Sequence, residues 1–230
     1  MKKKYFIQLV FIFLFFNIIH GYCQPSILSL KKLEKNFLKI NDTLFAYKYE
    51  TSNELYNLFL SMQPNRDLEY SLLQVDSTNW RLLKYSNEPY AQYYHFHPSF
   101  LNYPVVNISF EGAILFCEWL TNCYNIYSGR KYKKVEIRLP SSDEWDILFN
   151  YIAYKDSVLQ TNHLSSIDSY KERNKFYNVL GNVKEMTSTK GLAKGGDWKN
   201  GIDLSKLDYY YNERSTPFIG FRFFIVIKEK

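Results

Sequence analysis

The sequence predicts an α+β fold with much irregular structure, and three observations lead to this prediction. Apolar residues recur at helical spacing in three separate segments. Short runs typical of strands occupy residues 44–49 and 221–227. Residues 154–177 are polar and poorly periodic, which indicates a long surface excursion. No repeat, low-complexity tract or Gly/Ser linker divides residues 24–230, so we expect these elements to form a single domain.

Each predicted helix is preceded by side chains that can bind the free amides of its first turn. Thr51 and Glu54 form a candidate capping box, Ser109 is a candidate cap, and Ser141 with Glu144 forms a second box. The apolar faces that follow comprise Leu55, Tyr56, Phe59 and Leu60; Ala113, Phe116, Cys117 and Leu120; and Trp145, Leu148, Phe149 and Ile152.

Two cysteines of the second predicted helix are not expected to form a disulfide. Cys117 and Cys123 lie six residues apart, so their α-carbons would be ~9 Å apart in a helix. A disulfide closes at most ~7 Å. Cys117 is most simply a small buried hydrophobic residue.

The first 23 residues resemble a cleaved export signal. Lys2–Lys4 form a positive segment, Leu9–Phe16 an apolar core, and Gly21–Cys23 a cleavage site before Gln24. A transmembrane anchor would need ~20 apolar residues, which is longer than this core. We therefore expect an exported protein, located in the periplasm, at the outer-membrane periphery or outside the cell.

Lipidation of Cys23 is the other alternative, and only then would the mature chain associate with a membrane. Bulky Tyr22 does not fit the small residue that lipoprotein signals carry at that place. Removal of residues 1–23 takes away three lysines and lowers the net charge from +6 to +3. The remaining basic residues are interspersed with acidic ones, so we expect no nucleic-acid partner.

Six short motifs follow one another between residues 44 and 227. They are Glu50-Thr51-Ser52-Asn53; Tyr103-Pro104-Val105-Val106-Asn107 with Phe116-Cys117-Glu118-Trp119; Arg138-Leu139-Pro140 with Glu144-Trp145; Asn178 with Gly181-Asn182-Val183 and Glu185; Gly195-Gly196-Asp197-Trp198; and Gly220-Phe221-Arg222. In this order they resemble the formylglycine-generating-enzyme (sulfatase-modifying-factor) domain. The resemblance implies an irregular variant of the C-type-lectin fold, with a twisted antiparallel sheet, flanking helices and long loops.

The chemistry of the enzymes that the chain resembles needs residues that are missing here. Formylglycine-generating enzymes are thiol oxidases that use two cysteines, copper and dioxygen. Those cysteines lie between the Gly-Gly-x-Trp and Gly-Phe-Arg motifs, where Lys199–Ile219 contains none. Without a thiolate pair, copper is not an expected cofactor and formylglycine formation is not an expected activity.

A metal-dependent oxidase of the same family is the alternative enzyme. His95 and His97 could face the same way on a strand, but an aromatic-rich loop before Pro98 explains them more simply, and spacing nominates no third ligand. No catalytic residue is therefore assigned.

A calcium site is the metal site that the resemblance favours. In the family, the Asn…Gly-Asn-x-x-Glu turn wraps a cation with oxygen atoms. Here Asn178 and Glu185 would supply side chains, and Gly181 and Val183 carbonyl groups. The alternative, of equal weight, is a glycine turn in which Glu185 pairs with an arginine. Arg222 would need such a partner if buried, and Glu144 or Glu185 could serve.

The resemblance implies a binding or scaffolding module of the bacterial cell envelope, with an envelope protein or a glycan as partner. Similar domains occur in ring lipoproteins of a gliding and secretion machinery. Others are lectin-like proteins with a diversified ligand surface just before the last strand. The predicted ligand-binding residues in that segment are Tyr209, Tyr210, Tyr211 and Arg214, with the edge of the core as the alternative place for the tyrosines.

Overall fold

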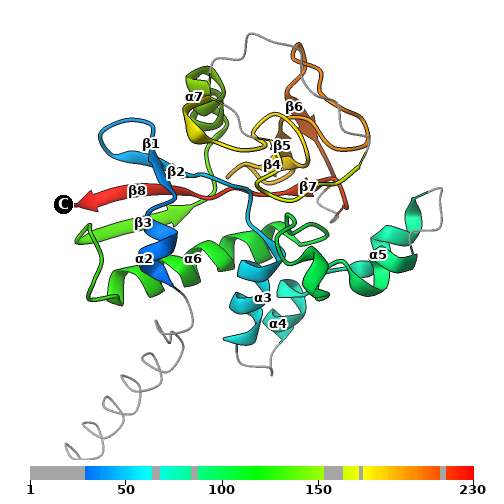
Figure 1. The fold of residues 1–230 in the computed structure, drawn as a ribbon, viewed down its shortest axis with the longest axis horizontal. Coiled ribbons are helices and arrows are strands. Elements are labelled where there is room, and N and C mark those ends of the chain that lie inside the picture. Colours follow the sequence, from blue (N-terminus) through cyan, green and yellow to red (C-terminus); the bar gives the residue numbers. More distant parts are fainter. Residues whose placement is uncertain (1–28, 64–67, 84–87, 153–162, 171–172, 213–215) are drawn as a thin grey trace, which may run out of the picture.

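The protein is built from two four-stranded sheets with helices packed around them (Figure 1). The computed structural model describes residues 29–63, 68–83, 88–152, 163–170, 173–212 and 216–230. The predicted export signal, residues 1–23, lies outside these ranges. Within them, no helix has both the length and the apolar character needed to cross a membrane.

The first sheet is antiparallel throughout, with the strand order β1-β2-β8-β3. Its strands are β1 (Phe37–Lys39), β2 (Leu44–Tyr47), β8 (Phe224–Glu229) and β3 (Lys134–Arg138). The strand predicted at residues 44–49 is confirmed for its first four residues. Because β8 lies between β2 and β3, the last strand of the chain joins two segments that are far apart in sequence.

Apolar residues of β8 alternate between two cores, one on each face of this sheet. Ile225 and Ile227 belong to the larger core with helix α6 (Phe110–Ile126), whereas Phe224 packs in a second core with helix α7 (Ser142–Ile152). Figure 1 shows α6 and α7 on opposite sides of the sheet. Burial of both faces explains why this segment is almost continuously apolar.

The caps predicted for α6 and α7 are confirmed. The Ser109 hydroxyl accepts a hydrogen bond from the Gly112 amide at 2.9 Å. At the start of α7, the Ser141 hydroxyl accepts from the Glu144 amide at 3.1 Å, while the Glu144 carboxylate accepts from the Ser141 amide at 2.8 Å. This reciprocal pair is a capping box.

The cap predicted for the first helix is wrong by one residue. Helix α3 (Asn53–Ser61) is capped by Ser52, whose hydroxyl accepts from the amide three residues further on at 3.2 Å. Thr51 is held in place by its backbone instead. Its amide donates to the Phe221 carbonyl at 2.9 Å, and its carbonyl accepts from the Val105 amide at 2.8 Å. The helix can therefore begin only after this residue.

The second sheet has the order β6-β5-β4-β7 and is mixed, because β7 runs parallel to β4. Its strands are β4 (Lys184–Met186), β5 (Leu192–Lys194), β6 (Asp208–Tyr210) and β7 (Ile219–Gly220). The prediction of one continuous strand at residues 221–227 is wrong, because residues 221–223 lie between two strands of different sheets. β7 ends at Gly220 in the second sheet, and the chain then crosses to the first sheet, where β8 begins at Phe224.

Part of the excursion predicted at residues 154–177 is buried rather than exposed. Leu164 and Ile167 are buried, and Phe176 is fully buried in the core beneath α7. Residues 153–162 and 171–172 lie outside the described ranges. The remaining helical elements are α2 (Leu30–Glu34), α4 (Leu68–Leu73), η1 (Ser77–Leu82), α5 (Glu88–Tyr93), η2 (Pro98–Phe100) and η3 (Arg173–Lys175).

Candidate functional site

The loop before β4 has a backbone that asparagine tolerates better than most residues. Asn178 and Asn182 have φ angles of 52° and 64°, in the left-handed region. The Asn178 side-chain oxygen accepts from the Tyr170 amide at 3.1 Å, and the Asn182 side-chain oxygen accepts from the Ser165 amide at 2.9 Å. Both side-chain oxygens therefore bind protein groups.

The buried side chain of Glu50, which lies between β2 and α3, holds the inner side of this loop. Glu50 is fully buried, and its Oε2 accepts from the side-chain amides of Asn178 at 2.9 Å and Asn182 at 2.8 Å. Its Oε1 accepts from the Val183 amide at 3.3 Å. Burial raises the pKa of Glu50 to about 8, although the hydrogen bonds from Asn178 and Asn182 act in the opposite direction. Sequence reasoning placed Glu50 in a motif but did not assign it to this loop.

Glu185 forms a buried ion pair with Arg222. Its Oε1 accepts from Arg222 Nε at 2.9 Å and from Nη2 at 2.7 Å, and both side chains are 0% exposed. Its Oε2 accepts from the Trp145 indole at 2.9 Å. Of the two carboxylates considered for Arg222, Glu185 is the partner, whereas Glu144 binds Arg138 at 2.6 Å.

The four predicted calcium ligands lie in one stretch of chain, but the two that were predicted to bind through side chains have protein partners. Asn178 binds Glu50, and Glu185 binds Arg222, as in the alternative given above. Gly181 is half-buried and Val183 is fully buried. In the described part of the chain, no three His, Cys, Asp or Glu residues are grouped so that they could hold a metal. Calcium binding stays a prediction.

The prediction can be tested by thermal melting with and without a calcium chelator. Calcium that binds only the folded chain adds ~2.7 kcal/mol when present at 100 times its Kd. We expect chelator to lower the melting temperature of the wild type but not to lower that of Glu185→Ala any further. The quantity compared between the two proteins is the change in melting temperature on adding chelator. The melting temperatures themselves cannot be compared, because Glu185→Ala removes the partner of Arg222 and so lowers the melting temperature without any effect of calcium. An unresponsive wild type would contradict the prediction.

The predicted ligand-binding tyrosines lie on and just after β6, at the edge of the second sheet. Tyr209 is 41% exposed and Tyr210 is 74% exposed. Tyr211 is half-buried and packs against the larger core. The structure therefore separates two surface tyrosines from one that is anchored. Arg214 lies outside the described residues.

Two lysines of the second sheet lie close to residues of β6, one on the adjacent strand β5 and one on β4. Lys194 on β5 donates to Asp208 at 2.6 Å and to Asp146 of α7 at 3.0 Å. Lys184 on β4 pairs with Asp197 and lies 4.8 Å from the centre of the Tyr209 ring. Sequence reasoning missed both lysines. Lys194 directly precedes the Gly-Gly-Asp-Trp motif and Asp197 lies inside it, so this motif is the sequence signal that points to both lysines.

The two candidate oxidase histidines do not converge. His95 is buried, with its ring nitrogens 3.4 Å from the Trp80 indole nitrogen and 3.3 Å from the Asn53 side-chain oxygen. Burial lowers the pKa of His95 to about 3, so it is neutral at physiological pH. His97 is exposed and caps η2 through the Ser99 amide.

The expectation that Cys117 is a buried residue of the α6 apolar face is confirmed. Cys117 belongs to the larger core, and burial raises the pKa of its thiol well above the usual range. A thiol in this environment stays protonated and is a poor nucleophile.

Comparison with known structures places this geometry within a recognised fold. CarF aligns with a TM-score of 0.51 and 15% sequence identity, covering 84% of this chain and 93% of CarF. CarF has the formylglycine-generating-enzyme-like variant of the C-type-lectin fold. The chain has a formylglycine-generating-enzyme-like fold. This confirms the predicted α+β class.

Two further structures resemble the chain less closely than CarF does. Treponema denticola variable protein 1 has a TM-score of 0.49 and 14% identity, covering 80% of this chain and 84% of that one. PvdO from Pseudomonas aeruginosa has a TM-score of 0.42 and 14% identity, covering 55% and 63%. No family model and no curated protein matches the sequence.

Within the formylglycine-generating-enzyme-like fold, side-chain hydrogen bonds join several of the motifs found in the sequence. Glu50 and Asn178 bind each other, and Arg222 binds Glu185. The Trp198 indole donates to the Pro217 carbonyl at 2.9 Å, which fastens the Gly-Gly-Asp-Trp motif to the segment before β7. These contacts connect segments that are far apart in the sequence.

Proposed function

We propose that this chain is an exported, non-catalytic, formylglycine-generating-enzyme-like domain that binds a protein of the cell envelope and acts there as a scaffold. One observation carries the proposal. The interval in which the enzymes of this fold carry their cysteines is occupied here by β6, which presents Tyr209 and Tyr210 to solvent. Tyrosine supplies a large contact area at a low cost in conformational entropy.

The backbone of β6 favours a protein partner over a glycan. The Leu207 carbonyl accepts from Gly195 and the Tyr211 amide donates to Gly191, so these residues face β5. In an antiparallel pair the intervening residues face away, which directs the backbone groups of Asp208 and Tyr210 outward. No strand in the described part of the chain pairs with that side. An extended segment of another protein can add there as a further strand.

The experiment uses a photo-crosslinking amino acid at position 210, in mature protein added to an envelope fraction of the source cells. We expect a crosslinked product that a protease removes. The control position is Tyr93, which is 50% exposed but lies on α5. The mass of the mature amino terminus, expected at Gln24, tests export in the same preparation.

The energetic test is Tyr210→Ala. We expect it to weaken partner binding by about 1–2 kcal/mol and to leave the melting temperature nearly unchanged, because the side chain is exposed. Tyr211→Ala serves as the comparison. Because Tyr211 packs against the core, its replacement by alanine should lower the stability of the fold. Equal crosslinking at positions 93 and 210, or a product that only glycosidases remove, would contradict a protein partner at β6.

A further inference from the structure

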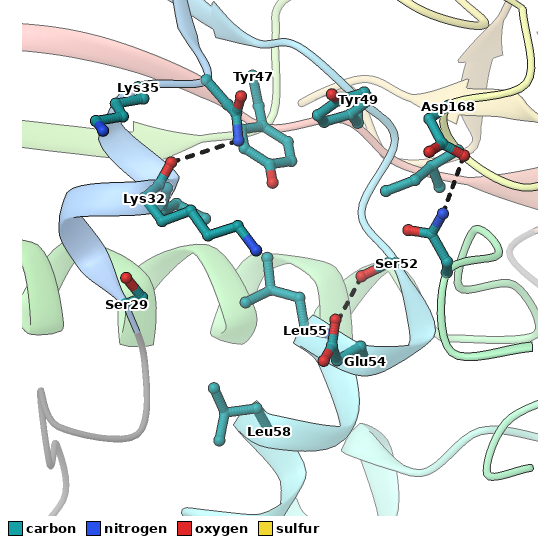
Figure 2. Close-up of a pocket in the computed structure, with 14 residues that line it drawn as sticks. Ser29, Lys32, Lys35, Tyr47, Tyr49, Ser52, Glu54, Leu55, Leu58 and Asp168 are labelled. Atoms are coloured by element: carbon teal, nitrogen blue, oxygen red, sulfur yellow. Dashed lines mark hydrogen bonds between the residues drawn. The ribbon is translucent and has the colours of Figure 1, made fainter. Parts of the chain in front are cut away.

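A cavity of about 520 Å³ lies between α2, the end of β2 and the start of α3 (Figure 2). Figure 1 shows these elements well away from β6, so the cavity is separate from the proposed interaction surface. Its volume lies in the range of small-molecule sites. Its lining includes Lys32, Tyr47, Glu54, Leu55, Leu58 and Asp168.

Part of the lining is apolar and fixed in position. Tyr47 is buried and stacks on Phe223, with ring centres 4.5 Å apart. Burial raises the pKa of Tyr47 to about 12, so its hydroxyl is neutral at physiological pH. Leu55 and Leu58 of α3 provide further apolar surface. Such a wall suits the hydrocarbon part of a ligand.

The charges of the lining are divided between its sides. Lys32 lies on α2 and Lys35 directly follows this helix, whereas Glu54 comes from the first turn of α3. Asp168 accepts hydrogen bonds from the neutral side chains of Asn102 at 2.9 Å and Ser166 at 2.8 Å. Figure 2 shows the Lys32 side chain extending from α2 towards Leu55, with Glu54 beside that leucine.

These charges are not neutralised by one another. Among the ion pairs of the described residues, none includes Lys32, Lys35 or Glu54. The ammonium of Lys32 and the carboxylate of Glu54 are therefore more than 4.0 Å apart, although they line the same cavity. A ligand with one charge of each sign could bridge them through charge-assisted hydrogen bonds.

We propose that this cavity binds a zwitterion with an apolar side chain, such as a free amino acid or a short peptide with free ends. The ligand carboxylate pairs with Lys32, its ammonium pairs with Glu54, and its side chain lies on Leu55 and Leu58. A purely anionic ligand would meet the repulsion of two carboxylates, and a purely cationic one that of two lysines. The division of charge selects a ligand that carries both.

The experiment is isothermal titration calorimetry of the mature protein at low salt and pH 7. The probes are leucine, the dipeptide Ala-Leu, N-acetyl-Ala-Leu and Ala-Leu amide. We expect Ala-Leu or leucine to bind and each blocked end to weaken binding at least about tenfold. Whether leucine binds as well as Ala-Leu distinguishes an amino acid from a peptide. Binding is also expected to weaken as salt is added.

Three exposed positions give matched variants. Lys32→Gln should weaken Ala-Leu binding about tenfold but leave binding of Ala-Leu amide unaffected. Glu54→Gln should also weaken Ala-Leu binding about tenfold, but it should leave binding of N-acetyl-Ala-Leu unaffected. Lys31→Gln, on the same helix but outside the lining, should change nothing. All three side chains are exposed, so the variants should melt like the wild type. Absence of binding at millimolar concentration, or equal binding of blocked and unblocked peptides, would overturn the proposal.

Discussion

Glu185→Gln is expected to lower the free energy of unfolding by about 3–5 kcal/mol, because it leaves the Arg222 guanidinium buried without a counter-charge. Both side chains are 0% exposed in the structure. Urea unfolding of the mature chain measures the change. Glu111→Gln is the matched control, since Glu111 pairs with Lys190 at 2.8 Å but both side chains are over 40% exposed. The loss there should be at most about 1 kcal/mol.

The double variant Glu185→Gln, Arg222→Gln keeps the prediction decisive if the single variant folds poorly. The double variant should lose less free energy of unfolding than the two single variants together, by more than about 1 kcal/mol, because the two residues contact each other. Recovery will be incomplete, since Arg222 also donates to the Tyr47 carbonyl at 3.1 Å and to the Tyr177 carbonyl at 2.7 Å. Additive single changes would show that the pair contributes little as a pair.

Gly196→Ala is the second change with a large expected effect, a loss of about 1–3 kcal/mol or more. An added Cβ at this position would clash with Ile202 and lie 2.5 Å from the Gly201 carbonyl oxygen. A backbone oxygen cannot move aside as a flexible side chain can. The turn between Asp197 and Gly201, closed by two backbone hydrogen bonds, would have to open.

Gly181→Ala is a precise control for that change. Its added Cβ would lie 3.4 Å from Ile202, the same neighbour, which is ordinary van der Waals contact. We expect a change of at most about 0.5 kcal/mol in urea unfolding. If the two variants unfold alike, close packing at Gly196 is not what selects glycine there.

Local features of the fold were predictable because they depend on residues close in sequence. Ser109 and the Ser141–Glu144 pair act within a single turn of helix, so their spacing identifies them. Thr51 shows the limit of this reasoning. Its hydroxyl fits a cap as well as that of Ser52, but backbone bonds to distant segments decide where the helix begins.

The candidate site depends on contacts that spacing cannot supply. Glu50 meets Asn178 across 128 positions, and Glu185 meets Arg222 across 37. The sequence offered two acidic partners for Arg222, and only the fold distinguishes them. The exposure of Tyr210 depends in the same way on β6 being the edge of its sheet, which local composition does not determine.

The central place of β8 in the first sheet has a consequence for the order of folding. Leu44 pairs with Val226 and Val135 with Ile227, so β2 and β3 share no neighbour until residues 224–229 are present. Such distant pairings form slowly, because a long loop must close before any contact stabilises it. The first sheet therefore cannot be completed until residues 224–229 are available for pairing. We expect completion of the first sheet to be a late step of folding.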